Sequence, residues 1–142
     1  MPEHIETIYI EQFENQTTQF DLGTALFSEL SREIPATLGL QPAGREVADA
    51  VLTGQISGYA DQAQNLQTNP NSPAEVDVLQ RQVTITLQLE MLDVERNVIL
   101  WGGSITGRGE YRPDAGQTYE TGRLLAIENL LIQIRDRAQS QW

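Results

Sequence analysis

Apolar and polar residues alternate strictly along the segment from Val83 to Met91. Valine, isoleucine, leucine and methionine occupy the odd positions, while threonine, glutamine and glutamate fill the even ones. A period of two residues is typical of a β-strand with one face in a core and the other face outside. The segment therefore predicts a sheet with one apolar face, which the rest of the chain has to cover.

A hairpin is predicted from the residues after this strand. The stretch from Asp93 to Asn97 is rich in turn formers, and Val98 to Trp101 predicts a returning strand. A three-residue loop from Val94 to Arg96 puts the apolar residues of both strands on one face. The expected pairs are Met91–Ile99, Leu89–Trp101 and Ile85–Ile105. A slip of one residue would turn Trp101 to the polar face, which is costly. Asn97 is expected to end the loop in the left-handed conformation, which asparagine tolerates well.

The opposite face of this hairpin is predicted to be polar and nearly uncharged. A face that meets only water usually carries more charge, so this face is a candidate contact surface for a partner or ligand. Hydroxyls and amides suit a wet, hydrogen-bonded contact, and arginines at its far end from the turn would bind phosphate through two parallel bonds. The candidate residues are Arg81, Thr84, Thr86, Gln88, Ser104, Thr106 and Arg108. The alternative is a solvent-exposed face with the two arginines paired to Glu110 and Glu90.

The amino-terminal half predicts two strands with a helix between them. Ile5 to Glu11 is β-branched and aromatic, as a first strand is. Thr18 fits the start of a helical capping box, and apolar residues at spacings of three and four follow it. Pro35 is expected to end this helix at about Ile34. A second strand is predicted from Ala48 to about Tyr59.

Two segments complete the chain. Asp61 to Glu75 is interpreted as an irregular hairpin tip, centred on Asn69-Pro70-Asn71-Ser72-Pro73. From about Thr118 a helix is predicted to run to the carboxyl terminus. Its expected apolar face is Leu124, Ile127, Leu131, Ile134 and Ala138.

The predicted order is strand, helix, three antiparallel strands and helix. Each helix has one apolar stripe and the sheet has one apolar face, so the fold class is α+β with two layers. We expect one domain over residues 1–142, with both helices on one face of a four-stranded, mostly antiparallel sheet and the other face open. In the expected core, Leu22, Leu26, Leu30, Leu124, Ile127 and Leu131 pack on Ile8, Ile10, Leu87, Leu89 and Trp101.

Composition narrows the functional classes. The 20 acidic residues outnumber 9 basic residues, all of them arginine, and the net charge is -11. This charge argues against nucleic acid as a partner and against adsorption to anionic membranes. The chain contains no cysteine, which excludes disulfides, thiol nucleophiles and cysteine-ligated metals. No apolar run reaches the roughly 20 residues that span a bilayer.

Catalytic motifs are missing. The only histidine is His4, which we expect to be solvent-exposed near the terminus. The absence of cysteine excludes Cys-His sites, and with a single histidine near the terminus we expect no Ser-His-Asp site. The carboxylate pairs Glu11/Glu14 and Asp93/Glu95 are interpreted as charged edges of a strand and a turn. We therefore expect no enzymatic activity, no metal and no cofactor. Trp101 is a candidate for stacking against a ligand, but its predicted position on the inward face of the sheet assigns it to the core.

A series of short motifs then resembles the lipopolysaccharide-assembly lipoproteins, the LptE-like family. Thr7–Ile10 runs into Phe13-Glu14-Asn15-Gln16-Thr17, and Ala48–Ile56 follows with Tyr59. Leu100-Trp101, Gly109-x-Tyr111 and a final helix come next. Each motif alone is weak, but the series spans nearly the whole chain in the family's order. The first motifs also resemble a domain of TolB-like and curli-secretion lipoproteins.

The resemblance implies a non-enzymatic protein of the Gram-negative cell envelope. Such proteins are anchored by lipid on an amino-terminal cysteine at the periplasmic side of the outer membrane. They plug an LptD-like β-barrel and help it deliver lipopolysaccharide to the cell surface. The family fold is two helices on a four-stranded sheet, which agrees with the interpretation above.

Two features depart from this pattern. No lipid-anchor cysteine is present in the chain, and the protein is acidic although lipopolysaccharide is a polyanion. Any phosphate contact must therefore come from individual arginines. The alternatives are a stand-alone periplasmic module that binds a ligand or lipid, with a pocket between helices and sheet, and an enzyme that uses carboxylates.

Overall fold

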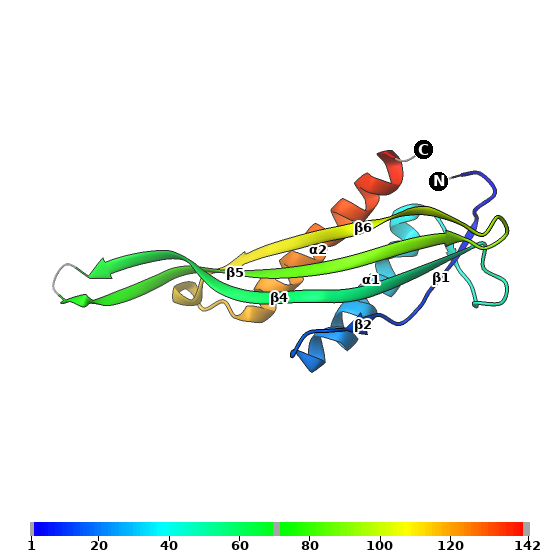
Figure 1. Ribbon diagram of the computed structural model, residues 1–142. Helices are drawn as coiled ribbons and strands as arrows, with labels where there is room; N and C mark the ends of the chain where they lie inside the picture. Colours follow the sequence, from blue (N-terminus) through cyan, green and yellow to red (C-terminus); the bar gives the residue numbers. More distant parts are fainter. Residues whose placement is uncertain (1, 70–71, 141–142) are drawn as a thin grey trace.

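The computed structural model describes residues 2–69 and 72–140. One mixed sheet runs the length of the molecule, and both helices lie against the same side of it (Figure 1). The elements in chain order are β1 (Thr7–Ile10), β2 (Glu14–Asn15), α1 (Phe20–Leu38), β3 (Gln41–Pro42), β4 (Ala50–Asn69), β5 (Ser72–Asp93), β6 (Val98–Tyr111), the short 3-10 helix η1 (Pro113–Ala115) and α2 (Tyr119–Ser140). The predicted α+β class and two-layer arrangement are confirmed.

The sheet has six strands in the order β3-β1-β4-β5-β6, with β2 pairing on β4. The expected four strands are β1, β4, β5 and β6, and two strands of two residues each are added to them. β4, β5 and β6 pair in antiparallel fashion, whereas β1, β2 and β3 pair in parallel. The parallel pairing of β1 with β4 is possible because α1 connects them and covers the sheet between them.

The core lies between the helices and one face of the sheet. The residues predicted on the inward face of β5 are fully buried, as is the stripe of α1 formed by Leu22, Leu26, Leu30 and Ile34. Trp101 is only 5% exposed, which confirms its assignment to the core. We call the uncovered side of the sheet the open face.

The β5–β6 hairpin differs from its predicted register by two residues. Met91 pairs with Trp101 and Leu87 with Ile105. The predicted three-residue loop is wrong: Asp93 pairs with Val98, so the loop has four residues, which shifts the register by one. A bulge in β6 at Leu100 adds the second residue. A shift of two residues keeps Trp101 inward, but the bulge turns Ile99 onto the open face, where it is 51% exposed. Asn97 does adopt a positive φ of 55°, as predicted.

The helix boundaries and one helix face also differ from the predictions. Pro35 lies inside α1, which continues to Leu38 and ends at Gly39 with a φ of 72°. Pro35 is buried with the apolar stripe of α1, which offsets the loss of one backbone hydrogen bond. The predicted Thr18 cap is wrong: α1 begins after Gln19, which makes no side-chain cap. In α2, Leu124 is 52% exposed, and Ala126 and Leu130 are buried instead.

The largest correction concerns the stretch predicted as an irregular tip. β4 and β5 run through it as paired strands of 20 and 22 residues, with register shifts between Ala63 and Asn69. β6 ends at Tyr111, opposite Arg81, so beyond this point only two strands remain. We call this ribbon, residues 62–69 and 72–80, the arm, and it projects beyond both helices (Figure 1). Pro70 and Asn71, at the predicted centre of the tip, lie outside the described residues.

Candidate functional site

The polar residues predicted for β5 and β6 do gather on the open face. The register pairs Thr84 with Arg108, Thr86 with Thr106 and Gln88 with Ser104. Gln88, Ser104 and Arg108 are exposed, and the three threonines are half-buried. The hydroxyls of Thr86 and Thr106 lie 3.5 Å apart, within reach of a hydrogen bond. Five of these side chains are uncharged, so the centre of the open face offers donors and acceptors without a net charge.

β4 extends this polar surface, which the sequence interpretation missed. Gln55 pairs with Gln88, and Thr53 pairs with Glu90, so their side chains share the open face. The signal was present in the spacing of Leu52, Gly54 and Ile56, which assigns the residues between them to the other face. Gly54 gives up its side chain on the core face because the Phe13 ring occupies that space, 2.5 Å from where a Cβ would stand.

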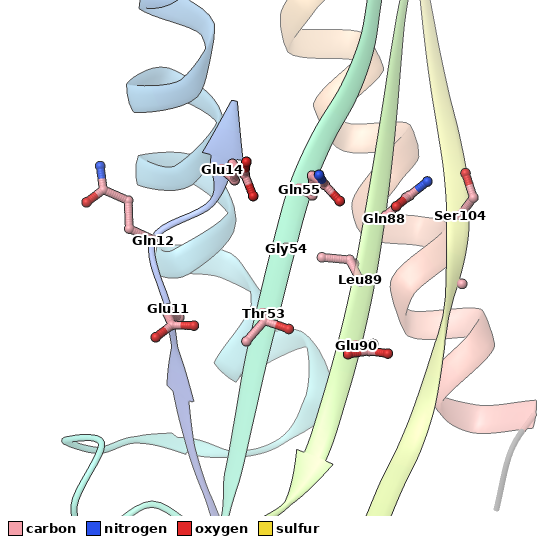
Figure 2. Close-up of a pocket in the computed structure, with 11 residues that line it drawn as sticks. Glu11, Gln12, Glu14, Thr53, Gly54, Gln55, Gln88, Leu89, Glu90 and Ser104 are labelled. Carbon is pink, nitrogen blue, oxygen red and sulfur yellow. The ribbon is translucent and has the colours of Figure 1, made fainter. Parts of the chain in front are cut away.

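A shallow trough of about 690 Å³ lies across the open face. Figure 2 shows Gln55, Gln88 and Ser104 in a row across β4, β5 and β6. Carboxylates surround them: Glu90 lies on β5, and Glu11 and Glu14 lie where the chain passes from β1 to β2 (Figure 2). This end of the face suits neutral or cationic groups and repels phosphate.

The turn end of the open face is apolar. A second pocket of about 280 Å³ is lined by Val51, Leu92, Val94 and Ile99, with Arg45 and Glu90 at its polar side. Arg45 is itself held by an ion pair with Glu11. The bulge at Leu100 creates this patch because it brings Ile99 to the open face. The open face thus changes from apolar at the turn to polar in its middle.

Arg108 provides the positive charge at the other end of the polar surface. It is exposed on β6, and its guanidinium forms neither an ion pair nor a hydrogen bond with the side chains that the structure describes. The predicted alternative, in which Glu110 and Glu90 pair with the two arginines, is not seen among these residues. Arg108 is therefore available to an anionic group from outside the protein.

Arg81 lies on the opposite side of the sheet, so its predicted place on the polar face is wrong. It shares the alternation of Val83 and Ile85, which points its side chain to the helix side. Its Nε donates to the Asp61 carboxylate at 3.0 Å, and a second nitrogen donates to the Asp61 carbonyl oxygen at 3.0 Å. Asp61 also accepts a hydrogen bond of 2.7 Å from the Tyr111 hydroxyl. We call these three residues the clasp.

The clasp stands where the three-stranded sheet narrows to the arm. Burial is the main cause that raises the pKa of Tyr111, and the Asp61 carboxylate adds to it. The hydrogen bond to Asp61 raises the pKa of Arg81, so its charge persists at any ordinary pH. Since both charges of this ion pair are satisfied inside the protein, we interpret the clasp as a structural feature.

His4 is half-buried, contrary to the expectation of a solvent-exposed residue. Its Nε2 lies 2.6 Å from a carboxylate oxygen of Asp93, which is fully buried at the end of β5. Asp93 also accepts a bond from the Arg96 amide in the turn. The hydrogen bond from His4 is the main cause that lowers the pKa of Asp93. Asp93 is thus a buried anchor for the amino-terminal segment, and its interpretation as a charged turn edge is wrong.

Two observations on the described residues concern metal ligands and membrane-spanning helices. Within residues 2–69 and 72–140, no three His, Asp or Glu side chains are placed to hold a metal ion. Over the same residues, neither helix is both long and apolar enough to cross a bilayer. The two pockets described above lie on the open face rather than between the helices and the sheet.

Solved structures with similar folds come from several bacteria. Lipoprotein GNA1162 from Neisseria meningitidis is 14% identical, with a TM-score of 0.55 over 92% of this chain and 99% of that one. Protein CT253 from Chlamydia trachomatis is 9% identical, with a TM-score of 0.61 over 96% of each chain. PelC from Paraburkholderia phytofirmans, solved as a dodecamer, is 15% identical, with a TM-score of 0.55 over 89% and 86%. At these identities the likeness shows the fold alone.

Sequence comparison identifies the family. A search of curated proteins found no match to this chain. The family model described as lipopolysaccharide-assembly, LptE, matches residues 5–141, from the strand before α1 to the end of α2. The match therefore includes every element of the sheet and both helices. On this evidence the chain belongs to the lipopolysaccharide-assembly family, LptE.

Proposed function

We propose that this protein is a non-enzymatic assembly partner of an LptD-like β-barrel, and that its open face contacts the barrel wall or lipopolysaccharide. Membership of the LptE family supports a role in lipopolysaccharide assembly. The barrel partner, delivery to the cell surface and the contact residues are the proposal. It includes a position at the periplasmic side of the outer membrane, held there by an amino-terminal lipid anchor.

The observation that carries the proposal is the composition of the open face. Three adjacent strands present hydroxyls and amides over the middle of the sheet, and no helix covers them in the described structure (Figure 1). Charged side chains are confined to the ends of this area, at Glu90 near the turn and at Arg108 and Glu110 at the other end. Surfaces of this kind form wet interfaces in which water molecules bridge the two partners.

Charge divides the face between the two proposed contacts. The carboxylates around the trough disfavour a phosphate there, so the trough end is assigned to the barrel wall. Arg108 lies at the opposite end and is assigned to a phosphate of lipopolysaccharide. Arg81 is left out of the contact surface because Asp61 holds it on the helix side.

Co-purification with the native barrel tests the protein contact. In Thr84→Glu/Thr86→Glu, and separately in the more exposed pair Gln88→Glu/Ser104→Glu, added charge and bulk should abolish recovery of the barrel. The matched control is Thr18→Glu/Thr24→Glu, which adds the same charge at exposed threonines on the α1 side. Urea melts identify any variant that fails to fold. Normal recovery from both open-face variants would exclude this face as the contact.

A binding assay with purified lipopolysaccharide tests the second contact. Arg108→Ala should weaken binding about tenfold or more, as the loss of a charge-assisted phosphate contact does. Arg135→Ala removes an exposed arginine of α2 and should bind normally. Equal binding by both variants would contradict the assignment of Arg108. Because the two assays use different ligands, failure of one leaves the other as an independent result.

A further inference from the structure

β6 is the last strand of the sheet, and its outer edge would be open to another strand. In an antiparallel strand, alternate residues direct both their N–H and C=O groups away from the paired neighbour. On β6 these residues are Gly102, Ser104, Thr106 and Arg108, the same residues whose side chains or Cα atoms lie on the open face. A row of unpaired backbone groups is a template for pairing with another chain.

Three side chains of α2 occupy this edge. Arg137 donates to the Ser104 carbonyl at 3.0 Å, and Gln133 donates to the Thr106 carbonyl at 2.7 Å. The Arg108 amide donates to the Asn129 side-chain oxygen at 3.1 Å. Gln133 also donates to that oxygen at 3.0 Å, which links two members of the row. We call Asn129, Gln133 and Arg137 the edge guard.

The spacing of the edge guard matches the spacing of the strand. Its members are four residues apart on the helix, which is a rise of about 6 Å. Their backbone partners are two residues apart on β6, a rise of about 6.6 Å. Each member of the edge guard therefore meets the next outward-facing residue of β6, as each residue of a paired strand would. Side chains of α2 thus make hydrogen bonds that the backbone of a further strand would otherwise make with β6.

Glycines of β6 allow the helix to approach this closely. A Cβ on Gly109 would stand 2.0 Å from the Gly122 carbonyl oxygen, and one on Gly107 would stand 2.3 Å from the Ala126 carbonyl oxygen. A Cβ on Gly103 would stand 2.6 Å from a guanidinium nitrogen of Arg137. Larger residues would push α2 outward and withdraw the edge guard from the backbone groups it contacts.

We propose that the edge guard keeps β6 from pairing with another β-strand, and that the strand it excludes is β6 of a second copy of this chain. Two copies related by a two-fold axis would present the same outward groups to each other in antiparallel register. Three hydrogen bonds between α2 and β6 occupy the Arg108 N–H and the carbonyl oxygens of Thr106 and Ser104, so these groups cannot pair with another strand. This inference does not depend on the barrel or on lipopolysaccharide as partners.

A pair of matched double variants tests the inference. Gln133→Ala/Arg137→Ala removes two members of the edge guard. Gln139→Ala/Arg135→Ala removes the same residue types, at the same spacing and with the same change of charge, from the exposed side of α2. In sedimentation experiments over rising concentration, the first variant should shift towards the mass of a dimer while the control follows the wild-type chain. Equal behaviour of the two variants would overturn the proposal.

Amide hydrogen exchange locates the association. In Asn129→Ala/Gln133→Ala/Arg137→Ala, the Arg108 amide should exchange about five to ten times faster in dilute solution, as the loss of one hydrogen bond implies. At high concentration its protection should return, because a second β6 then accepts the bond. Arg137→Lys keeps a donor and should remain close to the wild-type chain. A dimer that forms without protection of Arg108 uses another surface and would overturn the proposal, and a thermal melt shows whether each variant is folded.

Discussion

The covered part of the sheet and the arm are built from the same two strands but are held in different ways. Between the β5–β6 turn and the clasp, β4 and β5 lie beside β6 with both helices against one face, and the inward side chains of β5 are fully buried. In the arm, the same strands continue as a ribbon of two, beyond both helices (Figure 1). Isolated two-stranded ribbons are marginally stable in water. The contrast shows that strand length and core size are set by different parts of the sequence.

The lengths of the helices and strands explain why part of the sheet lies beyond the core. α1 has 19 residues and α2 has 22, which give lengths of about 28 and 33 Å. β5 has 22 residues and extends for about 73 Å. Helices of this length cover only part of such a strand, so the uncovered remainder has to project. The clasp of Asp61, Arg81 and Tyr111 stands at the point where the covered part ends.

The largest expected loss of stability comes from a substitution in the covered part of the sheet. Trp101→Ala should lower the free energy of unfolding by about 3–5 kcal/mol, because it leaves a large cavity in the core. Trp101→Phe should cost less, since the buried indole nitrogen has no hydrogen-bond partner within the described structure. Urea melts measure both. A loss below about 1 kcal/mol in Trp101→Ala would show that the core does not depend on this part of β6.

An intermediate loss of stability is expected at the clasp, where the covered part of the sheet meets the arm. Tyr111→Phe should lower the free energy of unfolding by about 1 kcal/mol, because it removes the bond to Asp61. The raised pKa of Tyr111 means that the folded state holds its phenolic proton more tightly than the unfolded state. This contribution to stability is present below about pH 10 and is lost as the pH rises through the raised value. Urea melts from pH 8 to 11 should fall more steeply for the wild-type chain than for Tyr111→Phe, and parallel curves would contradict the role of this hydroxyl.

The smallest expected loss of stability comes from shortening the arm. Replacing residues 64–80 by a four-residue turn of Asn and Gly should change the free energy of unfolding by about 1 kcal/mol or less, because the ribbon adds little to the core. The clasp residues remain in this variant. A raised pKa of Tyr111 would show that the clasp is still formed. A loss comparable to that of Trp101→Ala would show that the arm and the covered part fold as one unit.

Side-chain alternation predicted the two faces of the sheet well. The inward positions of β5 and the polar positions of β5 and β6 follow directly from a period of two, and a register error of two residues does not disturb them. The same rule, applied to Arg81, places it with Val83 on the helix side. Its predicted place on the polar face came from its charge and position along the strand rather than from alternation.

Other features could not be predicted from local patterns. The arm has a composition of Asn, Pro, Ser and Gln that is typical of loops, and it forms strands only because its two halves pair with each other in one hairpin. Pro35 is a helix terminator in isolation, but the core around it keeps α1 helical. The edge guard consists of polar residues on a helix surface, whose partners on β6 are known only once α2 is docked.

The separation of arm and core has a consequence for how this protein can vary. Inserting two residues into each strand of the arm lengthens it by about 6.6 Å and leaves the parity of every paired position unchanged. Deleting the same number shortens it by the same step. The reach of the arm can therefore be adjusted in discrete increments by evolution or by design, without altering a single contact beneath the helices.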